Sequence, residues 1–126
     1  RKAVAENPNT PPSVLEMLSN EVDRVRQSVA ENRNTSIDVL RKLGNPKTEP
    51  EGMVRWTVAK NPSTPPDLLR VLGNQKTEHM PSVRGIVAEN PSAPVDLLRS
   101  MTNPENERIP SVRAAAEKAL VARGLT

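Results

Sequence analysis

The chain has 126 residues with no cysteine, one histidine, one aromatic residue and a formal net charge of +3. The lack of cysteine excludes disulfides and thiolate metal sites, and the small positive charge falls short of the basic tract typical of nucleic-acid-binding proteins. No apolar run approaches the roughly 18 residues that predict a transmembrane helix, so we expect no membrane-spanning segment.

One sequence frame recurs along the whole chain and carries an arginine at a fixed place, at Arg1, Arg26, Arg55, Arg84 and Arg113. Successive arginines are 25, 29, 29 and 29 residues apart, and such periods are typical of repeat proteins. We therefore predict a single array with repeats at about 1–24, 25–53, 54–82 and 83–111, closed by a C-terminal cap at 112–126. Because the chain begins inside the frame, we expect it to be a fragment of a longer protein.

The first half of each copy predicts a short helix. In the third copy, Val54, Val58 and Ala59 lie along one stripe of a helix, which can face a core. Asn61-Pro62 is predicted to end this helix, because a proline disfavours helical geometry in the residue before it.

The second half predicts another short helix, from about Pro65 to Leu72 in the third copy. Thr64 is predicted to cap it by accepting a hydrogen bond from an early amide, and Asp67 suits the positive end of the helix dipole. Gly73 is expected to end the helix in a left-handed conformation. The apolar stripe of this helix consists of Leu68, Leu69 and Leu72.

Three copies depart from this pattern. In the second copy Arg33 replaces the proline, so we expect a looser turn there. In the fourth copy Ala93 replaces the threonine, which predicts a helix start weaker by about 1 kcal/mol. The last copy has no Asn-Pro break, so we predict one longer, alanine-rich helix that closes the array.

Apart from the closing helix, each predicted helix is shorter than the roughly 12 residues at which an isolated helix becomes marginal in water. The stripes of one copy must therefore be buried against those of the next, which predicts an all-α fold of stacked helix pairs.

The recurring pattern Val-Arg-x-x-Val-Ala-x-Asn-Pro-x-Thr-Pro-x-x-Leu-Leu resembles the leucine-rich repeat variant (LRV) family over nearly the whole chain. The resemblance implies a right-handed solenoid, or superhelix, of short helix pairs, one α and one partly 3₁₀, stacked much as in HEAT and armadillo repeats. The four-residue insertions of the later copies depart from the family pattern. Some members carry a cysteine-ligated iron–sulfur segment, but this chain has no cysteine, so no cofactor is expected.

The periodic arginines are the main candidates for a site, namely Arg26, Arg55, Arg84 and Arg113 together with Arg1. A cation near the start of a helix is mildly unfavourable and needs a compensating partner. In a structural interpretation they reach carbonyl groups or carboxylates of a neighbouring copy, with Asp38, Asp67 and Asp96 as the periodic acids. In a functional interpretation they face outward and bind phosphates or an acidic peptide, while the glutamates of the loops form a separate acidic face.

Trp56 is the second candidate. Its place in the frame is taken by unrelated residues in the other copies, which favours a surface position and a role as the anchor for a partner. A half-buried structural role fits equally well. His79 is expected to be a solvated loop residue, and the column of Arg41, Arg70 and Arg99 is expected to be a solvated helix face.

From these patterns we predict a cytoplasmic, non-catalytic scaffold for protein–protein interaction, without a catalytic residue, metal or cofactor. The alternative function is phosphate or nucleic-acid binding through the arginine column.

Overall fold

The computed structural model describes residues 1–125, and these residues form nine α-helices and no β-strand. The helices are α1 (Lys2–Glu6), α2 (Pro12–Leu18), α3 (Asp23–Glu31), α4 (Ile37–Leu43), α5 (Gly52–Lys60), α6 (Pro66–Leu72), α7 (Pro81–Glu89), α8 (Val95–Met101) and α9 (Pro110–Ala122). The all-α prediction is therefore confirmed for the described residues.

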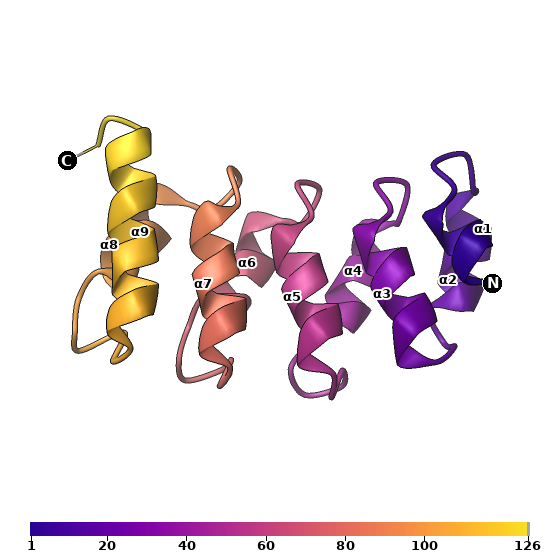
Figure 1. Ribbon diagram of the computed structural model, residues 1–126, viewed down its shortest axis with the longest axis horizontal. Coiled ribbons are helices and arrows are strands. Elements are labelled where there is room, and N and C mark those ends of the chain that lie inside the picture. The colour runs from indigo at the N-terminus through magenta and orange to yellow at the C-terminus, as the bar shows by residue number, and fades with distance from the viewer. Residues whose placement is uncertain (126) are drawn as a thin grey trace.

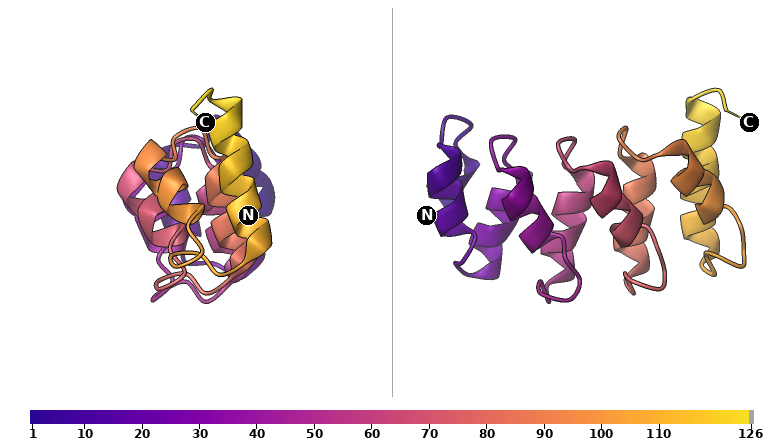
Figure 2. Two further views of the ribbon diagram at one scale, coloured as in Figure 1. Left: turned by 90° about the vertical axis from the view of Figure 1, so that its left-hand side faces the viewer. Right: turned by 180° about the vertical axis from the view of Figure 1, so that it is seen from behind.

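The helices lie in two layers along one long axis (Figures 1 and 2). The first layer consists of α1, α3, α5, α7 and α9, each of which packs on the next one of that layer. The second layer consists of α2, α4, α6 and α8, which lie behind the first layer in Figure 1. The helices α1 and α9 lie at opposite ends of the row, and each helix packs mainly on helices of its own or the adjoining copy (Figure 1).

The helix boundaries follow the local signals of the sequence. The helix α5 ends at Lys60 and is followed by Asn61 in extended conformation, as predicted from Asn61-Pro62. The predicted second helix corresponds to α6, Pro66–Leu72. The longer closing helix is α9, Pro110–Ala122, and the last residue of the predicted cap, Thr126, lies outside the described residues. The second-layer helices are α-helical, so the 3₁₀ segment implied by the family resemblance is not found in residues 1–125.

The prediction that threonine caps the second helix is wrong. The N-cap residue of α6 is Pro65, and no side-chain hydrogen bond caps this helix. Instead, Thr64 donates its hydroxyl to the backbone oxygen of Val58 at 2.5 Å, as Thr35 does to that of Val29 at 2.6 Å. The Thr64 hydroxyl thus gives a second donor to a carbonyl in the last turn of the preceding helix, which also accepts from the backbone N–H of Asn61 at 3.1 Å. Replacement by Ala93 in the fourth copy therefore affects the end of α7 rather than the start of α8.

The glycines that end the second-layer helices are needed for space rather than for a left-handed backbone. Gly44 and Gly73 have φ of −98° and −96°, so the predicted left-handed conformation is wrong. A Cβ atom on Gly44 would lie 2.8 Å from Cγ1 of Val58, and one on Gly73 would lie 3.1 Å from Cγ1 of Val87. Each glycine lets a valine of the next copy approach the end of the helix.

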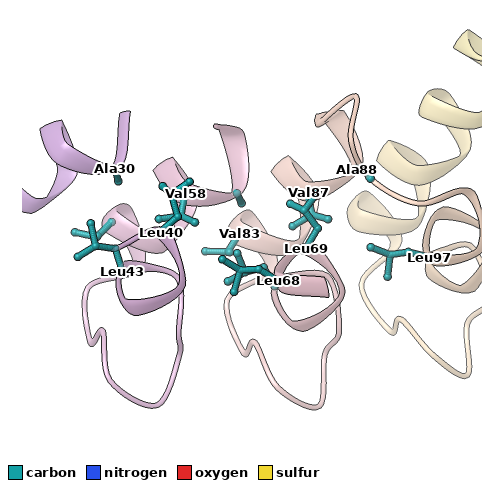
Figure 3. Packing of buried hydrophobic residues seen from close by; sticks show 14 of the residues in the cluster. Ala30, Leu40, Leu43, Val58, Leu68, Leu69, Val83, Val87, Ala88 and Leu97 are labelled. Carbon is teal, nitrogen blue, oxygen red and sulfur yellow. The ribbon is translucent and has the colours of Figure 1, made fainter. Parts of the chain in front are cut away.

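The core is a continuous band of small aliphatic side chains that runs from Ala5 to Leu120. Figure 3 shows Val58 of α5 beside Leu40 of α4, and Val87 of α7 beside Leu69 of α6. All four side chains are fully buried. Each copy thus completes its core with residues from the next copy, which explains how helices of five to nine residues remain folded.

Candidate functional site

The periodic arginines form a buried chain of ion pairs and hydrogen bonds inside the array. Arg55 donates from Nε to Oε1 of Glu78 at 2.7 Å and from Nη2 to Oε2 at 3.1 Å. Its Nη1 donates to the backbone oxygen of Glu49 at 2.7 Å. Arg55 is 7% exposed and Glu78 is fully buried. One guanidinium therefore bridges the loops on both sides of its helix.

The same geometry recurs on either side. Arg26 pairs with Glu49 at 2.8 and 2.9 Å, and Arg84 pairs with Glu107 at 2.6 and 2.9 Å. The Nη1 atoms of Arg84 and Arg113 donate to the backbone oxygens of Glu78 and Glu107, both at 2.8 Å. Each loop glutamate therefore binds one arginine through its carboxylate and the next through its carbonyl.

The glutamate carboxylates also accept hydrogen bonds from the backbone of their own loops. Oε2 of Glu78 also accepts from the backbone N–H of Met80 at 3.1 Å, and Glu49 and Glu107 do the same with the N–H two residues further along. No buried side-chain nitrogen or oxygen in residues 1–125 lacks a hydrogen-bond partner. A buried bidentate pair of this kind is stable only while both partners are present, because removing one leaves a buried charge at a cost of about 3–5 kcal/mol.

These contacts decide between the two interpretations of the arginines. The outward orientation is wrong for Arg55 and Arg84, which are buried, and the Arg26 side chain is only 19% exposed. Arg113 is half-buried, and Arg1 is exposed and pairs with Glu21. The structural interpretation holds, but the expected aspartate partners are wrong. The predicted acidic face is also wrong at Glu49, Glu78 and Glu107, because these carboxylates are buried.

The periodic aspartates pair with the other arginine column. Arg70 of α6 donates to Asp96 of α8 at 2.6 and 3.1 Å, and Arg41 of α4 forms the equivalent pair with Asp67 of α6. The hydrogen bonds from Arg41 and Arg70 lower the pKa of Asp67 and Asp96 below the ordinary value of 3.8. This column is exposed, as predicted, but it links neighbouring second-layer helices rather than being only solvated.

The two sets of arginine contacts above recur from copy to copy, and we call each such set a ladder. A third ladder is made by asparagines, which the sequence interpretation treated only as helix ends. Asn61 donates from Nδ2 to the backbone oxygen of Ala30 at 2.8 Å, and Asn90 does the same to Ala59 at 2.7 Å. Oδ1 of Asn32 accepts from the N–H of Asn34 at 2.8 Å, as Oδ1 of Asn61 does from that of Ser63 at 2.9 Å, so the turn beside Arg33 keeps this hydrogen bond, and its looseness stays a prediction. The sequence offered a signal for this ladder, because the second copy keeps Asn32 even though Arg33 replaces the proline that follows the asparagine in other copies.

At the C-terminal end of the array, an arginine donates to backbone oxygens in place of an asparagine of the ladder. Arg123, which follows α9, donates to the backbone oxygens of Ala93 at 2.7 Å and Asn90 at 3.1 Å. At the same two places of earlier copies, the backbone oxygens of Asn61 and Thr10 accept from the asparagine side chains of the copy that follows. The guanidinium thus satisfies the carbonyls exposed at the end of the fourth copy.

Trp56 is half-buried on the first layer, with the ammonium of Lys60 5.3 Å from its ring centroid. It borders an open groove of about 480 Å³ whose lining comes from α5, α7 and α9 and includes Gly85, Ile86 and Ala115. A second hollow of about 630 Å³ continues it along α9 and shares Glu89, Ser111 and Ala115. We call these two hollows together the first-layer groove.

A metal site was sought among the described residues. No group of three or more histidine, aspartate or glutamate side chains among residues 1–125 is placed to hold a metal ion. His79 is exposed on a loop, as predicted. No helix in this part of the chain has both the length and the apolarity needed to cross a membrane.

Comparison with known proteins gives no relative: no protein-family model, curated protein or solved structure matches this chain. The assignment of a function therefore depends on the surfaces described above.

Proposed function

We propose that this chain is a non-catalytic repeat scaffold that binds a protein partner through the first-layer groove. We also propose that its helix pairs form a right-handed solenoid of the LRV type. The solenoid is supported by the same three ladders recurring from copy to copy and by the row of stacked helices (Figure 2).

The first-layer groove carries this proposal. It combines one half-buried aromatic side chain with two small residues, Gly85 and Ala115. A Cβ atom built on Gly85 meets nothing within 4 Å, so the groove is open above this point of α7. Interfaces are enriched in tryptophan anchors, and the small residues at Gly85 and Ala115 let the backbone of a partner approach closely at these two points.

The charged groups of the interior support a scaffold rather than phosphate binding. The donors of Arg55 and Arg84 are engaged by glutamate carboxylates and by backbone oxygens. A phosphate could bind them only if it displaced a buried bidentate carboxylate, which would leave that carboxylate without its partner. No specific contact therefore favours the alternative of phosphate or nucleic-acid binding through the arginine column.

The proposal is tested by placing a photo-crosslinking amino acid at position 85, where the groove is open. A matched probe at Ser63, on the turn between α5 and α6, serves as the control. We expect position 85 to crosslink a protein that position 63 does not, and the purified partner to bind Trp56→Ala at least about tenfold more weakly than the parent chain.

Two further measurements serve as controls for this test. Trp56 packs against the core, so Trp56→Ala should unfold at a lower temperature than the parent chain. Circular dichroism should show that the variant is still fully folded at the temperature of the binding assay, so that weaker binding is not a folding defect. Gly85→Gln should block the groove and weaken the binding of the same partner. A partner that binds both variants as tightly as the parent chain would overturn the proposal.

A further inference from the structure

A second groove lies on the other layer, between α4 and α6. It has a volume of about 570 Å³ and is lined by those two helices and by the loops that follow them. Pro46, Leu68 and Val71 form its apolar wall, and Lys47, Lys76 and His79 contribute polar groups. We call it the second-layer groove. None of its lining residues belongs to the first-layer groove.

The second-layer groove carries uncompensated positive charge. Its only acidic lining residue is Asp67, which is already paired with Arg41. Neither Lys47 nor Lys76 forms an ion pair with any residue in the part of the chain that the structure describes. Both lysines are exposed, so their ammonium groups are free to meet an incoming anion.

The hollows at the neighbouring junctions of the second layer differ in size and charge. The one between α2 and α4 measures about 200 Å³ and is lined by two acids, Glu16 and Asp38, and one base, Lys42. The one between α6 and α8 measures about 90 Å³, and Lys76 is its only charged lining residue. Among these three hollows, only that between α4 and α6 joins a large volume to an excess of positive charge.

We propose that the second-layer groove binds an acidic, extended segment of a protein. Carboxylates of the segment would meet Lys47 and Lys76, and an apolar side chain between them would rest on Leu68 and Val71. Opposite charges across an interface favour encounter and fix its register, while the apolar wall adds contact area. This inference goes beyond the proposed function, because it concerns another surface and specifies the chemistry of the bound segment.

The composition of the groove favours a peptide over a nucleic acid. Proteins that bind single strands usually stack bases on aromatic side chains. The only aromatic residue of the chain, Trp56, borders the first-layer groove instead.

The test uses the whole chain and a fluorescein-labelled peptide of alternating glutamate and leucine, with binding measured by fluorescence anisotropy. We expect saturable binding that weakens with added salt. Lys47→Glu combined with Lys76→Glu should weaken it at least about tenfold. Lys60→Glu combined with Lys118→Glu makes the same change of charge on the first layer and should leave the binding constant nearly unchanged.

Three other probes decide what the groove recognises. A peptide with lysine in place of glutamate should not bind, and one with serine in place of leucine should bind more weakly. Trp56→Ala should bind the acidic peptide normally, which separates this inference from the proposed function. The inference is overturned if the peptide does not bind, if the two double variants lose binding equally, or if a single-stranded oligonucleotide binds more tightly than the peptide.

Discussion

Arg55 and Glu78 form a bidentate ion pair, with Nε of the arginine 2.7 Å from Oε1 of the glutamate and both side chains at most 8% exposed. The pair joins α5 to the loop that follows α6, 23 residues further along the chain. The backbone oxygen of the same glutamate accepts from Arg84, so the pair is one link of a chain that continues through the array. Neighbouring copies are thus held together by polar contacts as well as by the apolar band.

Breaking this pair on one side should strongly destabilise the array. Glu78→Gln removes the negative charge and leaves Arg55 buried without its counterion, which should lower the free energy of unfolding by about 3–5 kcal/mol. Urea denaturation measures this change. Glu105→Gln, an exposed glutamate of the next loop, is the control and should change it by less than about 0.5 kcal/mol.

Replacing both partners should be much less harmful than replacing one. Arg55→Met combined with Glu78→Leu removes both charges and keeps apolar volume, so most of the stability lost in Glu78→Gln should return. If the double variant were as unstable as the sum of the two single variants, the unpaired buried charge would not be the main cause of the instability. The same urea titrations make the comparison.

Asn61 offers a test of the asparagine ladder. Asn61→Ala leaves the backbone oxygen of Ala30 without its 2.8 Å donor, and we expect a loss of about 1–3 kcal/mol. Asn9→Ala is a suitable control, because the Asn9 side chain is exposed and makes no hydrogen bond in the described structure. Equal unfolding midpoints for the two variants would contradict the structural role of Asn61.

Replacing each of two glycines by alanine should change the stability of the chain in opposite directions. Gly85 lies within α7 with open space around its Cα, so Gly85→Ala should stabilise the chain by about 0.5–1 kcal/mol through the higher helix propensity of alanine. Gly44→Ala should destabilise it, because the new Cβ atom would lie 2.8 Å from Val58. Thermal unfolding of the two variants, compared with the parent chain, checks both signs.

The exposed pair of Arg41 and Asp67 gives a prediction for pH. The hydrogen bond from Arg41 lowers the folded-state pKa of Asp67 below 3.8, so the ionised carboxylate favours the folded state above that value. This contribution is lost as the pH falls through the lowered pKa. Arg41→Met should raise the pKa of Asp67 towards 3.8 and leave that of Asp96 unchanged, because Arg70 still pairs with Asp96.

The carboxyl carbon resonances of Asp67 and Asp96, followed by NMR during acid titration, measure both values. A rise at Asp96 as large as that at Asp67 would show that the substitution acts through the whole array rather than through one pair. No change at either residue would show that the Arg41 hydrogen bond has little effect on ionisation.

The sequence by itself determined the helices and their order. The signals involved are local: Asn61-Pro62 ends α5, and the leucines Leu68, Leu69 and Leu72 make one stripe of α6. Helix formation and helix ends depend mainly on residues within about four positions of one another, so a single copy contains the necessary information. The repeat of that copy then implied that the stripes of neighbouring copies pack together.

Only the tertiary structure decided which groups meet. Asp67 and Glu78 were both acidic and periodic, yet Arg55 binds Glu78, while Asp67 pairs with Arg41 on the other layer. Asn61 reaches a carbonyl 31 residues earlier in the chain. Such choices depend on how one helix pair is rotated and shifted against the next, and that geometry is set by side-chain packing between copies rather than by the residues within one of them.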